Sequence, residues 1–256
     1  MDHERTTVEQ FTRQAAGFSS AAAMNDADAM SLLLDAARLR PEDTVLDVAC
    51  GPGIVTAVAA RTAATAVGID LTPEMLELAR ARCTEQGLDN TRFDLGDVAE
   101  LPYDDGEFSR VVCRYALHHV ADPAAVVGEM ARVCAPGGRV VVADMIVGPD
   151  PKVAARFNEA ERTRDPSHVR SMTEGELLKL LRGAGLRPEP VGAYSLPMEL
   201  DALLARSASP DPDAVRAIYD AAIGGRQPLG IGERREGGRV RFAFPISVVT
   251  GDRDAS

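Results

Sequence analysis

The stretch LDVACGPGIVTAVAA, residues 46–60, joins an apolar run, a glycine-rich turn and an alanine- and valine-rich segment with helical spacing. The apolar run contains one acid, Asp47, and stops at Gly51-Pro52-Gly53. This order predicts a strand, a tight loop and a helix, which together present backbone amides to a ligand. Such a loop serves dinucleotides, phosphates or ligands without phosphate, and the neighbouring residues discriminate among them.

Two phosphate-binding motifs are incomplete in this loop. The dinucleotide fingerprint G-x-G-x-x-G lacks its third glycine, because Thr56 stands in that position. The Gly-Lys-Ser/Thr sequence of a Walker loop is also missing. Asp47, just before the turn, would repel a pyrophosphate and suit a cationic ligand. The residues therefore favour a ligand with a positive charge.

The segments around this stretch predict an α/β fold. Apolar segments alternate with helical ones, at 44–50, 65–71, 90–97, 108–117 and 139–145, and two later segments at 186–198 and 238–249 also have strand character. Near-continuous Val, Ile and Leu in such strands indicates a parallel sheet covered on both faces. We expect a doubly wound, seven-stranded, mostly parallel Rossmann-like sheet whose last strand is antiparallel.

The remaining segments divide the chain into four parts. Residues 1–40 form a helical N-terminal cap and 41–147 the ligand-binding core. The polar segment 148–172 is an expected lid insertion, and 173–256 completes the sheet with a helical insertion at about 199–237. Ligands of such sheets bind outside the carboxyl ends of the strands.

Composition excludes several classes of function. The net charge of −11 argues against binding of nucleic acids or acidic membrane surfaces. No segment reaches membrane-spanning length and the N-terminal residues lack an apolar region, so a cytoplasmic location is expected. The four cysteines stand singly, which predicts packed thiols rather than a metal site or disulfides.

Four segments in order resemble the class I S-adenosylmethionine-dependent methyltransferases: VLDVACGPG, VGIDLTPEML, the long segment from FDLGDVAELPYDDGEFS to ALHHVADP, and ARVCAPGGRVVVADM. LPYDDGEFS, ALHHVADP and APGGRVVVAD are most similar to the ubiquinone/menaquinone C-methyltransferase-like branch, which acts on small molecules. FTRQAAGF and RDPSHVR add a weaker likeness. The resemblance implies S-adenosylmethionine (SAM) as cofactor and 41–147 as its binding core.

The resemblance places the methionine end of SAM on the first loop. Gly51-Pro52-Gly53, together with Ala49, would let the backbone approach it, and Asp47 would attract its ammonium group. Arg114 falls where the fourth strand of the family meets the cofactor. A positive charge beside the sulfonium departs from the family pattern. We therefore expect the Arg114 side chain to point away from the sulfonium or to pair with the cofactor carboxylate.

The adenosine end falls on the next two strand ends. Asp70 would accept both ribose hydroxyls, as carboxylates do in dinucleotide folds. Leu71 and Met75 would flank the adenine. Asp97 would accept from the adenine amino group, while the amide of Val98 donates to the ring.

Other assigned side chains lie outside this row. Phe11 and Phe18 are expected to close over the site, although an apolar stripe on a helix is more often core. Met75, Asp47 and Asp97 also have structural alternatives as core or loop residues. A base is needed only if the methyl acceptor must lose a proton. The candidates are His119, His168 and Tyr115, with His118, Asp144, Asp165 and Arg170 nearby in sequence; a structural role is equally open for His119.

The predicted function is methyl transfer to an oxygen, nitrogen or carbon nucleophile of a small molecule, such as a secondary metabolite or a quinone-like compound. The Asp/Asn-Pro-Pro-Tyr/Phe motif of amino-methylating enzymes of nucleic acids is replaced by RYAL. No metal is expected, because Asp144 has no companion Asp-Asn pair. The alternative is a SAM-binding protein that transfers no methyl group, such as a cyclase, an isomerase, a decarboxylase or a binding module. A monomer or a homodimer fits either function.

Overall fold

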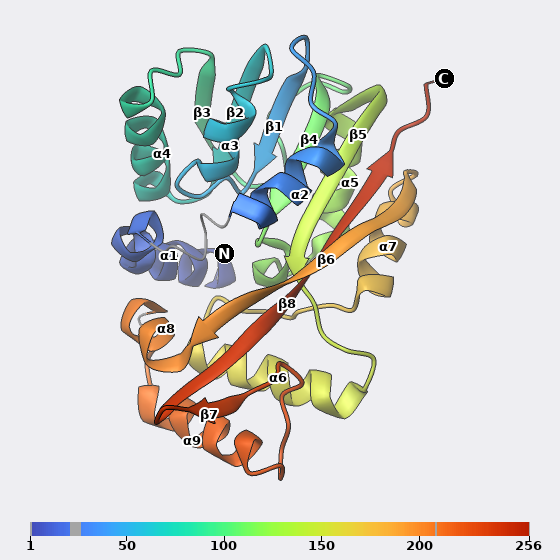
Figure 1. Cartoon of the computed structure of the whole chain (residues 1–256). Coiled ribbons are helices and arrows are strands. Elements are labelled where there is room, and N and C mark those ends of the chain that lie inside the picture. The colour runs from blue at the N-terminus through green and yellow to red at the C-terminus, as the bar shows by residue number, and fades with distance from the viewer. Residues whose placement is uncertain (1, 21–26, 208, 256) are drawn as a thin grey trace.

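A computed structural model of the chain describes residues 2–20, 27–207 and 209–255, with the side chains of 2, 16–20 and 27 also outside the description. Within these residues an eight-stranded sheet forms, in the order β3-β2-β1-β4-β5-β8-β6, with the short β7 paired to β8 (Figure 1). Its strands are β1 (Thr44–Val48), β2 (Thr65–Asp70), β3 (Thr91–Leu95), β4 (Phe108–Arg114), β5 (Cys134–Met145), β6 (Arg187–Glu199), β7 (Arg234–Glu236) and β8 (Arg239–Asp252).

The direction of the strands agrees with the sequence expectation. β3, β2, β1, β4 and β5 are parallel, and β8 is antiparallel to both β5 and β6. The predicted Rossmann-like α/β fold is confirmed. The prediction of seven strands omitted β7, whose polar three-residue segment forms a hairpin with the start of β8.

Helices cover both faces of the sheet. α2 (Ala27–Ala37), α3 (Ile54–Ala59) and α4 (Pro73–Glu85) pack on one face, whereas α5 (Pro123–Val133) and α7 (Glu174–Gly183) pack on the other (Figure 1). The side chains of Thr173 and Glu176 form a capping box at the start of α7. Burial of the apolar strands between two helical layers accounts for their near-continuous Val, Ile and Leu.

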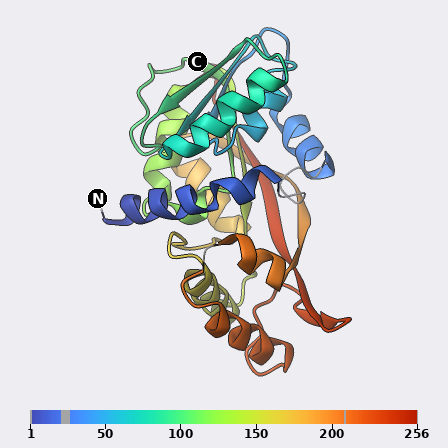
Figure 2. The ribbon, with the colours of Figure 1, turned by 90° about the vertical axis from the view of Figure 1, so that its left-hand side faces the viewer.

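A second group of elements lies beyond the carboxyl ends of the parallel strands. β6 and β8 are long enough to leave the sheet as a two-stranded ribbon, and α6 (Pro151–Arg164), α8 (Leu200–Ser207) and α9 (Pro212–Ile223) pack around its far part (Figures 1 and 2). This lower lobe has its own apolar core, which includes Phe157, Tyr219 and Phe242. α1 (Asp2–Ser20) lies between the sheet and the lower lobe (Figure 2).

No helix among the described residues is long and apolar enough to cross a membrane. The four cysteines are free and buried. Burial raises the pKa of the thiols of Cys50, Cys83, Cys113 and Cys134, which keeps them protonated at neutral pH.

Candidate functional site

A cavity of about 480 Å³ lies at the carboxyl ends of the parallel strands, and side chains of α1 line part of it. Its sheet-side half is lined by Asp47, Ala49, Gly51, Pro52, Asp70, Leu71, Met75, Asp97 and Val98. Its apolar half is lined by Met145, Leu196, Met198, Leu203, Phe244 and Ile246, from β5, β6, α8 and β8. The structure thus brings the predicted cofactor residues of three successive strand ends into one cavity.

The loop after β1 has a strained backbone. Ala49, Gly51 and Gly53 have φ angles of 55°, 51° and 70°, which lie in the left-handed region. A Cβ built on Gly51 would meet no atom within 4 Å, so this glycine leaves open space beside the cavity that it lines. A Cβ on Gly53 would lie 2.7 Å from the Cβ of Ala79. Gly53 does not line the cavity, and its need for glycine comes from the packing of α3 against α4.

Asp47 is fully buried at the end of β1. Its Oδ2 accepts hydrogen bonds from the backbone N–H of Thr56 at 2.9 Å and from the hydroxyl of Thr56 at 2.6 Å. Burial raises the pKa of Asp47 to about 7, and the charge of Asp70 acts in the same direction, while Thr56 and the charge of Arg114 oppose it. This carboxylate is therefore poised to ionise fully when a cation lies beside it.

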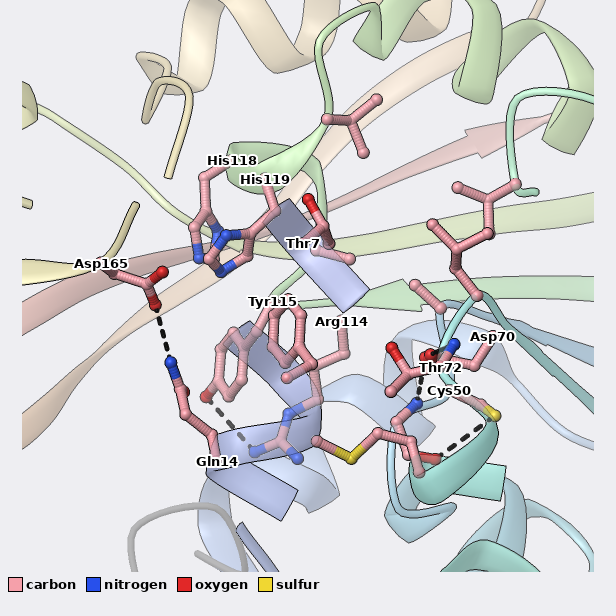
Figure 3. A pocket seen from close by; sticks show the side chains of 18 of the residues that line it. Thr7, Gln14, Cys50, Asp70, Thr72, Arg114, Tyr115, His118, His119 and Asp165 are labelled. Atoms are coloured by element: carbon pink, nitrogen blue, oxygen red, sulfur yellow. Dashed lines mark hydrogen bonds between the residues drawn. The ribbon is translucent and has the colours of Figure 1, made fainter. Parts of the chain in front are cut away.

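Asp70, at the end of β2, connects two loops. Its Oδ2 accepts from the N–H of Gly51 at 2.8 Å, and its Oδ1 accepts from the N–H of Thr72 at 2.9 Å (Figure 3). Burial raises the pKa of Asp70 and these hydrogen bonds counteract the rise. Each oxygen keeps a second lone pair, so the carboxylate can accept two more hydrogen bonds from a ligand.

The loop after β3 contributes the remaining polar group of the sheet-side half. Asp97 accepts from the N–H of Ala99 at 2.9 Å through Oδ1 and lines the cavity together with Val98. Met75, from the first turn of α4, is buried and lines the cavity, as does Leu71. Asp97 offers a hydrogen-bond acceptor, and Leu71 and Met75 offer apolar surface. A flat heterocycle requires both.

Arg114 and Tyr115 stand where the two halves meet. The guanidinium of Arg114 lies 4.3 Å from the ring centre of Tyr115 and donates to its hydroxyl at 3.3 Å (Figure 3). The Tyr115 hydroxyl also shares a hydrogen bond of 2.5 Å with Tyr194 on β6. Tyr115 has a φ of 57°, a strained conformation that turns the chain at the end of β4.

Two histidines follow on the 3₁₀ turn Leu117–His119. His118 Nδ1 lies 2.5 Å from Oδ1 of Asp144, whose Oδ2 accepts from the His118 N–H. His119 Nδ1 lies 3.0 Å from the hydroxyl of Ser167, which donates to Oδ1 of Asp165 at 2.5 Å. Burial and the neighbouring His118 lower the pKa of His119 to about 3, so its ring is neutral at physiological pH.

Asp165 belongs to a polar cluster from three elements. Its Oδ2 accepts from Gln14 of α1 at 3.2 Å and lies 3.7 Å from the guanidinium of Arg164 (Figure 3). Burial opposes its ionisation, yet the charge of Arg164 and the hydrogen bonds from Ser167 and Gln14 hold the pKa of Asp165 below its usual value. Asp165 is therefore a carboxylate that faces the cavity.

Other predicted residues have different environments. His168 is buried behind His118 and His119, does not line the cavity, and donates from Nε2 to Asn158 at 2.9 Å. Burial lowers the pKa of His168 far below its usual value. Arg170 pairs with Glu176 on the surface. Phe11 lines the cavity and packs edge-on against His119 with ring centres 5.0 Å apart, whereas the Phe18 side chain is outside the described residues.

Comparison with known proteins gives the family. A profile of the methyltransferase domain matches residues 46–142. The uncharacterized protein YafE of Escherichia coli is 32% identical over 166 residues, which cover 64% of this chain and 80% of YafE.

The chain belongs to the class I S-adenosylmethionine-dependent methyltransferases.

Two further relatives of this methyltransferase are informative. The uncharacterized methyltransferase YcgJ of Bacillus subtilis is 27% identical over 249 residues, which cover 96% of this chain and 98% of YcgJ. The crystal structure of YcgJ superposes with a TM-score of 0.82, covering 90% of this chain and 99% of that one. The 27-O-demethylrifamycin SV methyltransferase of Amycolatopsis mediterranei is 35% identical over 168 residues, 62% of this chain and 60% of the relative.

Several residues of the methyltransferase cavity had no signal in the sequence. Segments far apart in the chain contribute the apolar half of the cavity. They also contribute Arg164, Arg206 and the polar side chains of α1 that line the cavity. α1 is held by hydrogen bonds: His3 donates to the carbonyl of His119, Thr12 to Glu74, and Gln10 to the carbonyl of Ser207. The burial of Gln10 and Gln14 on a mainly polar helix could have been inferred only from the tertiary contacts.

Proposed function

We propose that this methyltransferase binds SAM in the sheet-side half of its cavity and transfers the methyl group to a small molecule held in the apolar half. The observation that carries the proposal is the convergence of Asp47, Asp70 and Asp97 with the strained Gly51 loop on one cavity that continues into an apolar half. Such a cavity accommodates a cationic, hydroxylated and heterocyclic ligand beside an apolar one.

The residues present fit the cofactor. Asp70 would accept from the ribose hydroxyls with its remaining lone pairs, and Gly51 would leave room for close approach, with Ala49 and Pro52 beside it. Leu71 and Met75 would flank the adenine, and Asp97 with the Val98 amide would bind its edge. When bound, SAM supplies an electrophilic methyl group and its own leaving group. The protein residues then have to orient the acceptor and exclude water.

Asp47 and Arg114 suit the two charges of an amino acid end. An ammonium group beside Asp47 would compensate the burial that raises its pKa. Arg114 lines the same cavity and would pair with the carboxylate while it stays stacked on Tyr115. In this proposal the arginine that departs from the family pattern binds the cofactor end and remains outside the path of the methyl group.

His119 is the proposed proton acceptor. Because the Ser167 hydroxyl donates to Asp165, its oxygen accepts from Nδ1–H of His119. The neutral ring then has an unprotonated Nε2, which can take a proton from the acceptor as the methyl group is transferred. The charge of Asp165 stabilises the protonated ring. His118, bound to Asp144, and Tyr115 would shape the site, and His168 has no place in the chemistry because it lies behind the cavity.

A small-molecule acceptor is supported by two observations. The likeness to the 27-O-demethylrifamycin SV methyltransferase favours a secondary metabolite or a quinone-like compound. The net charge of −11 disfavours a nucleic acid. The motifs of the central segment support membership in the ubiquinone/menaquinone C-methyltransferase-like branch. The proposed nucleophile is an oxygen, nitrogen or carbon atom of the acceptor. The proposed active form is a monomer or a homodimer.

Incubation with methyl-labelled SAM and a small-molecule extract of the source organism tests the proposal. Label that enters a small product supports methyl transfer. Conversion of a compound without incorporated label would instead support the alternative, in which the cofactor is bound and no methyl group is transferred. Failure of the protein to bind S-adenosylhomocysteine (SAH) in a calorimeter would overturn both.

A further inference from the structure

Arg206, on the last turn of α8, lines the apolar half of the cavity without a carboxylate partner among the described residues. We infer that the methyl acceptor carries an anionic oxygen group and that Arg206 binds it. The inference deepens the proposed function, because it assigns a chemical class to the molecule that enters the apolar half.

The contacts of Arg206 leave most of its hydrogen-bonding capacity unused. The side chain is half-buried, and its Nη2 donates to the thioether sulfur of Met198 at 3.7 Å. A sulfur is a weak acceptor, whereas a guanidinium has five N–H donors in a planar fork that suits a carboxylate or a similar oxyanion. A partly desolvated cation with so weak a contact is stabilised by an anion from outside the chain.

Glu161 and Asp165, the acids beside the neighbouring Arg164, are bound by other groups. Arg164 forms an ion pair with Glu161: its Nε and Nη2 donate to Oε2 of Glu161 at 3.0 and 2.7 Å. Asp165 is bound by Gln14, by Ser167 and by the charge of Arg164. Among the described residues, Arg206 therefore has no carboxylate partner, and its guanidinium can form an ion pair with a ligand.

The neighbouring arginine strengthens the need for an anion. Burial lowers the pKa of Arg206, and the charge of Arg164 lowers it further. Both side chains line the cavity, and Arg164 already has Glu161 and Asp165 beside it. A ligand anion beside Arg206 would favour its charged form.

The surroundings define the rest of the acceptor. Leu196, Leu203 and Phe244 offer an apolar surface on β6, α8 and β8, while His119 lies nearer the sheet. A molecule that fits all three features has an apolar body, a nucleophile directed to His119 and an oxyanion at the end near Arg206. This description excludes acceptors whose charged group is an amine.

A matched pair of fluorescent probes tests the inference. 8-Anilinonaphthalene-1-sulfonate has an apolar aromatic body with an oxyanion, and N-phenyl-1-naphthylamine has nearly the same body without one. Both are titrated into SAH-saturated protein, so that only the apolar half is open to them. The variants are Arg206→Met, Arg206→Lys and the control Arg216→Met, which removes an exposed arginine from α9.

We expect Arg206→Met to weaken binding of the sulfonate probe by at least about tenfold, or 1.4 kcal/mol, while the neutral probe binds within about twofold of the wild type. Arg206→Lys should give an intermediate affinity, because an ammonium keeps the charge and loses the planar fork. The control should change neither probe. Unchanged binding of the sulfonate probe, or an equal loss for both probes, would overturn the inference.

The outcome is separable from that of the proposed function. SAH affinity is measured for every variant, and it also reports folding, because Arg206 lies in the other half of the cavity. If SAH does not bind to the wild type, the proposed function fails. The probe titrations of the free protein then still decide whether Arg206 recognises an anion.

Discussion

The two halves of the cavity are built in different ways. The sheet-side half consists of short loops at neighbouring strand ends, where Asp47, Asp70 and Asp97 are held by backbone N–H groups. The apolar half is assembled from β6, β8 and α8, and its polar end depends on contacts such as Gln14 with Asp165, which are 151 residues apart. Backbone geometry fixes the sheet-side half, so this half can continue to bind its ligand when substitutions change the ligand that the apolar half binds. The following experiments ask whether the halves are separable in this way.

The largest effect is expected for His119→Gln. Loss of a general base costs about a hundredfold or more in rate, whereas SAH affinity should remain within about twofold, because the side chain serves the acceptor. Single-turnover transfer from labelled SAM to the isolated acceptor measures the rate. Since the pKa of His119 is lowered to about 3, the wild-type rate should show no titration of this ring between about pH 5 and 8. A hundredfold loss of SAH affinity would show that the halves are coupled.

Next in size is the difference between the two glycines of the first loop. Gly53→Ala adds a Cβ 2.7 Å from that of Ala79 and should lower the free energy of unfolding by about 2–3 kcal/mol. Gly51→Ala adds only strain in a left-handed conformation and should cost about 1 kcal/mol. Denaturant unfolding followed by circular dichroism compares them. Equal losses would contradict the assignment of Gly53 to packing.

Asp70→Asn should weaken SAH binding by more than about tenfold, because an amide offers one acceptor oxygen where the carboxylate offers two. The variant keeps an acceptor for one of the two backbone N–H groups, of Gly51 or Thr72, that Asp70 now binds. Titration calorimetry measures the affinity, and Asp89→Asn, an exposed acid, serves as the matched control. Wild-type affinity in Asp70→Asn would remove the main support for the sheet-side half as the cofactor site.

The smallest effect is a pH dependence in Asp47→Asn. A carboxyl whose pKa rises from 3.8 to about 7 on folding makes the folded state progressively less stable as pH rises through that window, and the loss is complete above it. The amide has no such charge and can still accept from Thr56. The variant should therefore gain stability relative to the wild type between about pH 4 and 7, by about 1–3 kcal/mol. SAH affinity should rise across this range in the wild type alone, and parallel unfolding curves for both proteins would contradict the burial of the charge.

The same contrast explains what could be predicted from sequence. The fold follows from local patterns, since an apolar strand that ends in an acid or a glycine turn predicts its own place in the sheet. The expected cofactor contacts from Asp47 to Val98 came from the resemblance to the methyltransferase family. His168 and Arg170 were grouped with His119 by composition, yet His168 lies behind the cavity and Arg170 on the surface. Nothing in the pattern of α8 distinguishes Arg206 from any exposed arginine, because its position depends on how the ribbon of β6 and β8 directs that helix.

α1 has a consequence for how molecules enter and leave. On one side Thr12 donates a hydrogen bond to Glu74 of α4, and on the other Gln10 and Gln14 both donate to the carbonyl of Ser207 of α8. Each such bond contributes only about 1 kcal/mol net, so α1 is held by a few polar contacts together with the packing of Phe11 on His119. Because one helix lies above both halves, its departure exposes them together. Spent cofactor and methylated product would then exchange through one opening.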